Sequence, residues 1–134
     1  MDEAKNTKIV QDAYAAFGRG DIPALLAILD PAVEWTTVVG SQTPTSGTHR
    51  GRDGVARFFQ LLAESIAFER FEPREFIAQG DKVVVLGHYA AKAKTTGRAF
   101  DTGWVMVFTL RNGLLTHFTE FADSAGINAA FASH

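Results

Sequence analysis

Two side chains of this sequence, the carboxyl group of Glu120 and the imidazole of His88, are suited to moving a proton. Each lies in a segment whose alternating residues are typical of a strand. Successive side chains of a strand point to opposite faces, and this parity predicts that both residues share a face with Trp104 and Met106. Burial on such a face raises the pKa of a carboxyl group toward the range useful for general acid–base catalysis. We therefore predict Glu120 as acid or base and His88 as its partner. The alternatives are a solvated or ion-paired carboxylate and a hydrogen-bonded lining histidine.

The same parity predicts the walls of an apolar pocket around these two groups. Trp35 and Trp104 offer flat surfaces with one N–H donor each, suited either to stacking on a ring-shaped ligand or to filling the core. His49 lies in a polar stretch between residues 40 and 51 and either reaches the pocket mouth or stays in solvent. The predicted ligand-binding residues are Trp35, His49, Phe58, Leu86, Trp104, Met106 and Phe118.

Residues for other kinds of chemistry are missing from the sequence. It has no cysteine, which excludes disulfides, thiolate catalysis and cysteine metal sites. Its histidines form no recognisable metal-ligand spacing, and we find no phosphate-binding loop, dinucleotide-binding motif or serine-nucleophile motif. We therefore expect no metal and no cofactor. What remains is a set of groups suited to proton transfer in a dry site.

Length and composition predict one domain, residues 1–134. Apolar residues make up 46% of the chain and charged residues 21%, which is typical of a globular protein. The net charge of −2 provides no basic surface for nucleic acid or for an anionic membrane. The charged start, Met1–Lys5, is unlike a signal peptide, and no apolar run reaches 18 residues, so we expect a cytoplasmic protein.

The order of predicted elements indicates the α+β class. Apolar residues three and four apart predict helices near residues 9–17, 22–29 and 53–62, with Asp21 and Asp53 as caps of the second and third. A period of two then predicts a long antiparallel meander, with Asn112-Gly113 as its clearest hairpin turn. Asp123 is expected to cap a last short helix. The predicted strands are 32–38, 68–78, 82–95, 99–110 and 114–122.

Both faces of the predicted meander are apolar, although the helices can cover only one of them. Parity places Val84, Leu86 and His88 toward the pocket. The outward set needs another cover, and a second copy of the chain is the simplest supplier, so we predict a homodimer through the outer sheet face. This outward set is Val83, Val85, Val105, Val107 and Phe121.

In their order and spacing, several short motifs resemble the SnoaL-like, ketosteroid isomerase-like branch of the nuclear transport factor two-like superfamily, from Ile9 to Phe131. The resemblance implies a cone, in which a curved antiparallel sheet packs on three helices of the N-terminal half and encloses a pocket. It also implies a dimer across the outer sheet surface. The motifs are Arg19–Asp21, Asp30–Trp35, Pro44, Ser46–Thr48, Gly80–Leu86, Thr96–Arg98 and Arg111–Gly113.

The sequence departs from the steroid isomerases of that group at their catalytic positions. The base aspartate of those enzymes is replaced here by Trp35, and their second oxyanion donor falls close to Met106. Their oxyanion-hole tyrosine falls on Ala13, with Tyr14 expected to face elsewhere. The steroid isomerase machinery is therefore not preserved. Related cyclases place a catalytic aspartate near the corner that Asp123 occupies, which makes Asp123 a reserve catalytic candidate beside its capping role.

Members of this group include isomerases, polyketide cyclases, dehydratases, epoxide hydrolases and non-catalytic binders, so the fold alone selects no reaction. We predict a cofactor-independent isomerase, cyclase or dehydratase-type lyase that transfers a proton on a hydrophobic carbonyl-bearing or polycyclic compound. The main alternative is a non-catalytic binding protein for an apolar metabolite, and the third is a dimerisation module with a collapsed pocket. The expected pocket has the usual ligand-site volume of about 300–1,000 Å³.

Overall fold

A computed structural model describes residues 2–38, 41 and 43–132 of the chain, which form four helices and one six-stranded sheet. Helices at the start of the chain are followed by the long strands, as the change of period predicts. The helices are α1 (Glu3–Gly18), α2 (Ile22–Ala27), α3 (Gly51–Ser65) and α4 (Ser124–Phe131). The strands are β1 (Leu29–Thr37), β2 (Gly47–Arg50), β3 (Ile66–Gln79), β4 (Lys82–Ala93), β5 (Ala99–Arg111) and β6 (Leu114–Ala122).

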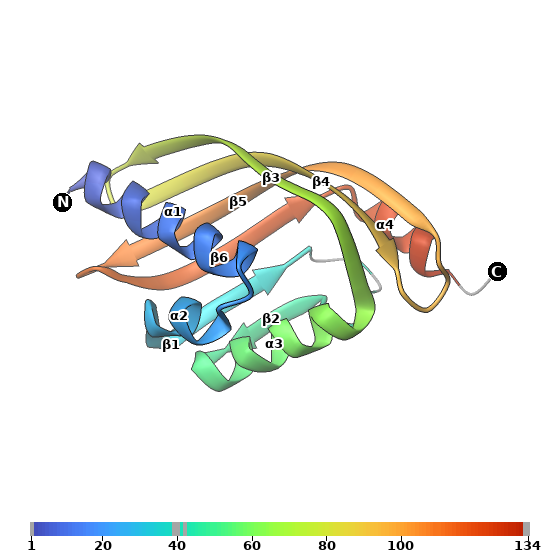
Figure 1. Cartoon of the computed structure of the whole chain (residues 1–134). Coiled ribbons are helices and arrows are strands. Elements are labelled where there is room, and N and C mark those ends of the chain that lie inside the picture. The colour runs from blue at the N-terminus through green and yellow to red at the C-terminus, as the bar shows by residue number, and fades with distance from the viewer. Residues whose placement is uncertain (1, 39–40, 42, 133–134) are drawn as a thin grey trace.

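The sheet has the order β2-β1-β6-β5-β4-β3 and curves around the helices of the N-terminal half (Figure 1). Helix α1 lies against β3 and β4, whereas α3 lies against β1 and β2. This arrangement confirms the predicted α+β class and the curved sheet packed on three helices. It differs from a purely antiparallel sheet in one pairing, because β1 runs parallel to β6. The sequence pattern shows the period of each strand but not its partner across the chain.

Aspartate side chains cap three of the helices. Asp2 accepts a hydrogen bond from a backbone N–H in the first turn of α1, and Asp21 and Asp123 do the same for α2 and α4. The caps predicted for Asp21 and Asp123 are therefore confirmed. The cap predicted for Asp53 is wrong, because α3 begins two residues earlier, at Gly51. Gly51 has φ +72°, a left-handed conformation that favours glycine, and it turns β2 directly into the helix.

The two faces of β4 are the reverse of those predicted. Val83, Val85 and Tyr89 point inward and are buried, whereas Leu86 and His88 lie on the outer face. Trp104 and Met106 of β5 do point inward, opposite Gly87 and Val85 of β4. Val83 and Val85 are thus core residues and not part of the outer surface. Because both sets of β4 residues are apolar, hydropathy alone does not show which set points inward, and the predicted register of β4 was one residue out.

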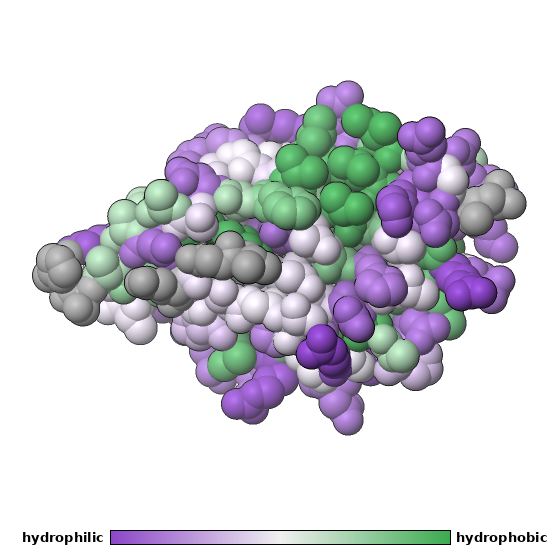
Figure 2. Space-filling view, turned by 180° about the vertical axis from the view of Figure 1, so that it is seen from behind, coloured by the Kyte–Doolittle hydropathy of each residue, from purple (hydrophilic) through white to green (hydrophobic). Residues whose placement is uncertain are grey.

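The outer sheet face carries an apolar surface, here called the outer patch. Ile77, Val84 and Val107 lie side by side across three strands, and Leu86, Val105 and Phe121 form a second such row. Phe121 is 58% exposed and Ile77 is 48% exposed. Seen from behind the view of Figure 1, apolar side chains gather on this side of the molecule (Figure 2). The outer patch consists of Ile77, Val84, Leu86, Val105, Val107 and Phe121.

On the inner face, Gly87 allows the ring of Trp104 to lie against the sheet. A Cβ atom at Gly87 would lie 2.3 Å from Cζ2 of Trp104 and 2.6 Å from the carbonyl oxygen of Glu72. The indole fills that space and stacks on Tyr14 and Phe71, at centroid distances of 6.0 and 5.3 Å. The absence of a side chain at one strand position therefore positions the aromatic layer behind the site.

Replacing Gly87 with alanine should destabilise the fold by about 1–3 kcal/mol, because the new methyl group overlaps both a packed ring and a backbone oxygen. The matched control is Gly103→Ala on the neighbouring strand, where the nearest atom to a new Cβ would be the Gly87 carbonyl oxygen at 3.7 Å, an ordinary contact. Urea unfolding of the two variants measures the difference. Equal stabilities would contradict the close approach of Trp104 to Gly87.

Candidate functional site

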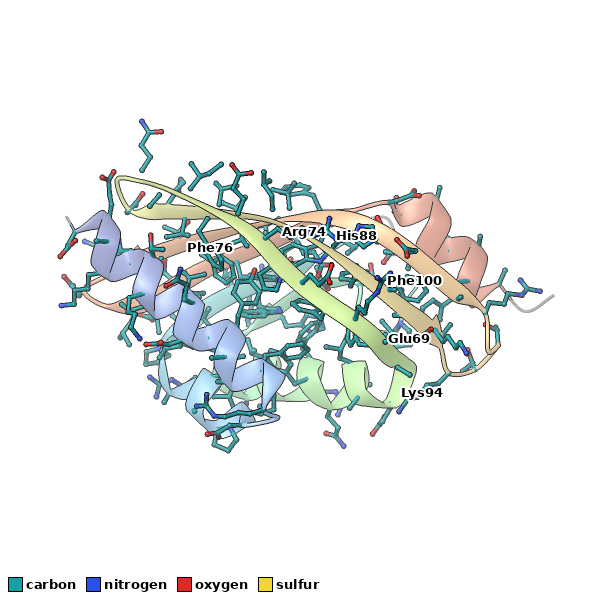
Figure 3. All side chains as sticks on the ribbon, turned by 45° about the horizontal axis from the view of Figure 1, so that its top comes forward. Glu69, Arg74, Phe76, His88, Lys94 and Phe100 are labelled. Atoms are coloured by element: carbon teal, nitrogen blue, oxygen red, sulfur yellow. The ribbon has the colours of Figure 1, made fainter. Side chains whose placement is uncertain are left out.

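Side chains crowd the layer between the helices and the sheet, from Phe76 near one end to Phe100 near the other (Figure 3). Within this layer lies a cavity with a volume of about 80 Å³. This is smaller than the predicted range, because aromatic rings fill much of the space. It has room for only a few water molecules, so a larger ligand requires rings to move. The aromatic lining residues are Tyr14, Phe17, Trp35, Phe58, Phe59, Phe68, Phe71, Tyr89, Phe100, Phe108 and Phe118.

Glu120 contributes the one carboxyl group that lines this cavity among the described residues. It lies in β6 between Met106 of β5 and Thr37 of β1, and it is 9% exposed. The hydroxyl of Tyr89 donates a 2.8 Å hydrogen bond to its Oε2 atom. Burial raises the pKa of Glu120 to about 7, although the Tyr89 hydrogen bond acts in the opposite direction. Near neutral pH, the group can therefore both accept and donate a proton.

Two tyrosines place hydroxyl groups near this carboxyl group. Burial and the nearby charge of Glu120 raise the phenol pKa of both Tyr14 and Tyr89 well above its usual value. Both therefore remain hydrogen-bond donors at all ordinary pH values. The Tyr14 hydroxyl donates to the sulfur of Met106 at 3.0 Å, a weak acceptor that a ligand oxygen would replace easily.

Neither tyrosine was identified as a site residue from the sequence. Tyr14 was expected to face away from the pocket, which is wrong, because it lines the cavity. The available signal was its spacing of four and three from Val10 and Phe17 on the apolar face of α1. Tyr89 was missed because the register of β4 was one residue out.

His88, the predicted partner of Glu120, lies on the other side of the sheet. Its Nε2 atom contacts a carboxylate oxygen of Asp101, which also pairs with Arg70 at 3.7 Å. Leu86 shares this outer face and belongs to the outer patch. Neither residue lines the cavity, so the sheet separates both from Glu120. The predicted Glu120–His88 pair is therefore replaced by Glu120 and Tyr89.

Of the other predicted ligand-binding residues, four line the cavity: Trp35, Phe58, Met106 and Phe118. Trp104 is 3% exposed but lies behind the cavity wall, over Gly87. His49 donates from Nε2 to the carbonyl oxygen of Thr45 at 2.8 Å, and its ring packs on Phe58. Asp123 uses its carboxylate to cap α4, at 3.1 Å from the N–H of Gly126.

A buried pair of threonines, which no pattern in the sequence singles out, forms a polar edge of the cavity. Thr37 donates from Oγ1 to the carbonyl oxygen of Thr45 at 2.5 Å, and both residues line the cavity. Thr37 lies beside Glu120 in the parallel pairing of β1 and β6. The sequence pattern does not show this pairing, so it gives no reason to place Thr37 next to Glu120.

The described residues contain no cluster of three or more histidine and acidic side chains that could hold a metal ion. In the same part of the chain, no helix is both long and apolar enough to cross a membrane.

A family model described as a SnoaL-like domain matches residues 10–118 of the chain. An NTF2-like protein from Burkholderia xenovorans is 36% identical, covers 98% of this chain and 99% of its own, and superposes with a TM-score of 0.91. TerC, crystallised with polyporic acid, is 29% identical over 94% of this chain and 97% of its own, with a TM-score of 0.84. An uncharacterised protein of Mycobacterium tuberculosis is 26% identical over 98% of this chain and its own full length.

Proposed function

The chain belongs to the SnoaL-like domain family, and we propose that residues 1–134 act as one such domain, an enzyme that transfers a proton on a hydrophobic substrate without a cofactor. The substrate class is a carbonyl-bearing or polycyclic compound, and the reaction is an isomerisation, cyclisation or dehydration. The observation that carries the proposal is the carboxyl group of Glu120, which is buried among aromatic rings and has a pKa of about 7.

The geometry gives the two oxygens of Glu120 different roles. Tyr89 binds Oε2 and so fixes the carboxyl group, while Oε1 has no hydrogen bond to the described residues. Oε1 would take a proton from a carbon next to the substrate carbonyl. The electron pair of the broken C–H bond would form a C=C bond to the carbonyl carbon, and the π electron pair of the C=O bond would move to the oxygen, which gives an enolate. The protonated carboxyl group then returns the proton at another atom. An apolar surrounding favours this step, because no water competes for the proton.

The small volume of the cavity, about 80 Å³, is the observation that favours the third alternative, a dimerisation module with a collapsed pocket. Such a module needs no room for a ligand, whereas an enzyme and a binding protein for an apolar metabolite both do. TerC, with 29% identity, was crystallised with polyporic acid, which supports ligand binding and provides a first compound for titration.

Hydrogen–deuterium exchange tests the enzymatic proposal without knowledge of the natural substrate. Ketones such as 1-indanone exchange the hydrogens next to their carbonyl group in D₂O, and NMR follows the loss of those signals. We expect the protein to accelerate this exchange for a ketone that binds in the cavity. If bound ketones exchange only at the rate of buffer, the binding protein becomes the better interpretation.

We also propose that a second copy of the chain covers the outer patch and forms a homodimer. Valines 105 and 107 lie in β5, one of the two inner strands of this four-stranded surface. Changing both to lysine should convert the dimer to a monomer, because charges buried without partners cost several kcal/mol. Sedimentation at micromolar concentration measures the change.

The matched control for this double variant is Gln11→Lys with Ala15→Lys, which adds the same charges on the exposed side of α1. We expect that variant to remain dimeric. A wild-type protein that sediments as a monomer under these conditions would contradict the proposed interface.

A further inference from the structure

Two buried hydrogen-bond donors of the described residues, the indole N–H groups of Trp35 and Trp104, have no acceptor. Trp35 is 5% exposed and Trp104 is 3% exposed. An indole nitrogen can only donate, and a buried donor without an acceptor destabilises a folded protein. Such a group calls for an explanation, and the two tryptophans differ in their surroundings.

Trp35 lines the cavity, whereas Trp104 does not. One face of the Trp35 ring is covered by Phe118, stacked at 3.9 Å with an angle of 19° between the planes. Phe58 and Phe59 pack against the same ring, with centroids 5.7 and 5.6 Å away. These three side chains offer no acceptor atom. Trp35 lines the cavity, and its N–H has no acceptor among the described residues, so a molecule bound in the cavity is the candidate to supply one.

The position of Trp35 relative to Glu120 follows from the register of β1 and β6. Trp35 pairs with Phe118, and Thr37 pairs with Glu120, all on the inner face of the sheet. Trp35 is therefore one inward position before the row of Glu120, a step of about 7 Å along the strands. The cavity wall thus carries a fixed N–H donor and a proton-transferring carboxyl group on neighbouring strands, with aromatic rings around both.

We propose that Trp35 is a ligand-binding residue, whose Nε1–H donates to an acceptor oxygen of the molecule that occupies the cavity. The ligand class is a flat, conjugated or aromatic compound. It carries a carbonyl or enolate oxygen about 7 Å from the atom that contacts Glu120, which is the spacing of two residues along a strand. This inference rests on the proposed function, because it assumes that the cavity takes a ligand. A site with a buried donor discriminates strongly against an analogue that lacks the acceptor, since the donor then stays unpaired.

The test compares 1-indanone with indane, which is the same bicyclic compound without the carbonyl oxygen. The chain has two tryptophans, so ¹⁵N–¹H NMR shows two indole N–H signals, which Trp35→Phe and Trp104→Phe assign by removing one each. We expect 1-indanone, but not indane, to shift the Trp35 signal to lower field, as a new hydrogen bond does. The Trp104 signal serves as the internal control and should keep its position.

Titrations of the same two compounds give the energetic part of the test. Trp35→Phe should weaken 1-indanone binding about three- to tenfold, the usual contribution of one neutral hydrogen bond, and leave indane binding within about twofold. Trp104→Phe removes the same atoms behind the cavity wall and should leave the ratio of the two affinities unchanged.

The outcomes distinguish a failure of this inference from a failure of the proposed function. If both compounds bind and neither the Trp35 signal nor the affinity ratio depends on the carbonyl oxygen, the inference is wrong and the proposed ligand cavity stands. If neither compound binds, the ligand cavity fails and this inference fails with it. A carbonyl-dependent shift of the Trp104 signal instead would place the acceptor elsewhere and also overturn the inference.

Discussion

Replacing Glu120 with glutamine should slow ketone exchange by about 10²–10⁴-fold, the usual contribution of a general acid or base. Glutamine keeps the shape of the side chain and can still accept the Tyr89 hydrogen bond, but its amide does not take up a proton from carbon. Binding of 1-indanone should therefore survive. Exchange rates measured by NMR at saturating ketone separate the loss of proton transfer from a loss of binding.

The pH dependence of exchange gives an independent check on the same residue. Only the carboxylate form of Glu120 acts as a base, so the rate should rise with pH and level off above about pH 7. Tyr89→Phe removes the hydrogen bond that lowers the pKa of Glu120, and it should move the midpoint of this profile to higher pH. Glu69→Gln, at an exposed position on β3, is the control and should change neither rate nor midpoint. A wild-type rate in Glu120→Gln would reduce Glu120 to a lining residue.

Glu120 should also make the fold less stable as the pH rises. The usual pKa of a glutamate is 4.5, and in the folded protein the pKa of Glu120 is about 7. Between these values the folded state binds the proton and the unfolded state does not, so raising the pH favours unfolding. The stabilisation is complete below about pH 4.5 and is lost by about pH 7, a change of about 3 kcal/mol at about 1.4 kcal/mol per pH unit.

Glu120→Gln lacks this titration. The free energy of unfolding of the variant minus that of the wild type should therefore increase by about 3 kcal/mol from about pH 4.5 to pH 8. Urea unfolding of both proteins at several pH values measures the difference, in which the titration of all other groups cancels. A difference between Glu120→Gln and wild type that does not change with pH would mean that folding does not bury this carboxyl group.

Local sequence signals predicted most of the secondary structure. The three- and four-residue spacings placed the helices, and the Asn112-Gly113 turn placed the hairpin of β5 and β6, with Asn112 and Gly113 both at positive φ. The short strand β2, in contrast, was predicted as part of a polar loop, because Gly47–Arg50 has no apolar alternation. Its strand form comes from pairing with β1, a tertiary contact that no local pattern contains.

The lining of the cavity was predicted only in part, because the direction in which side chains point is clear from the sequence in some strands and not in others. Glu120, Trp35 and Phe118 were placed on the inner face correctly, because polar residues alternate with them on the outer face: Glu34 and Thr36 in β1, and His117 and Thr119 in β6, although Phe121 on that face is apolar. In β4 both faces are apolar, so the choice between Leu86 and Val85 had no local basis. The decisive contact is between Gly87 and Trp104, which selects the inner face of β4 by shape and not by hydropathy.

The parallel pairing of β1 with β6 has a consequence for the order in which the site is assembled. The sheet order β2-β1-β6-β5-β4-β3 means that β1 and β2 join the other strands only through β6, the last strand of the chain. Trp35 and Thr37 therefore meet Phe118 and Glu120 only after more than half of the chain has been enclosed in a loop, a slow step in folding. On the ribosome, the cavity wall remains in two separate halves until β6 emerges. An incomplete chain thus exposes the aromatic residues of its future site to chaperones rather than to a substrate.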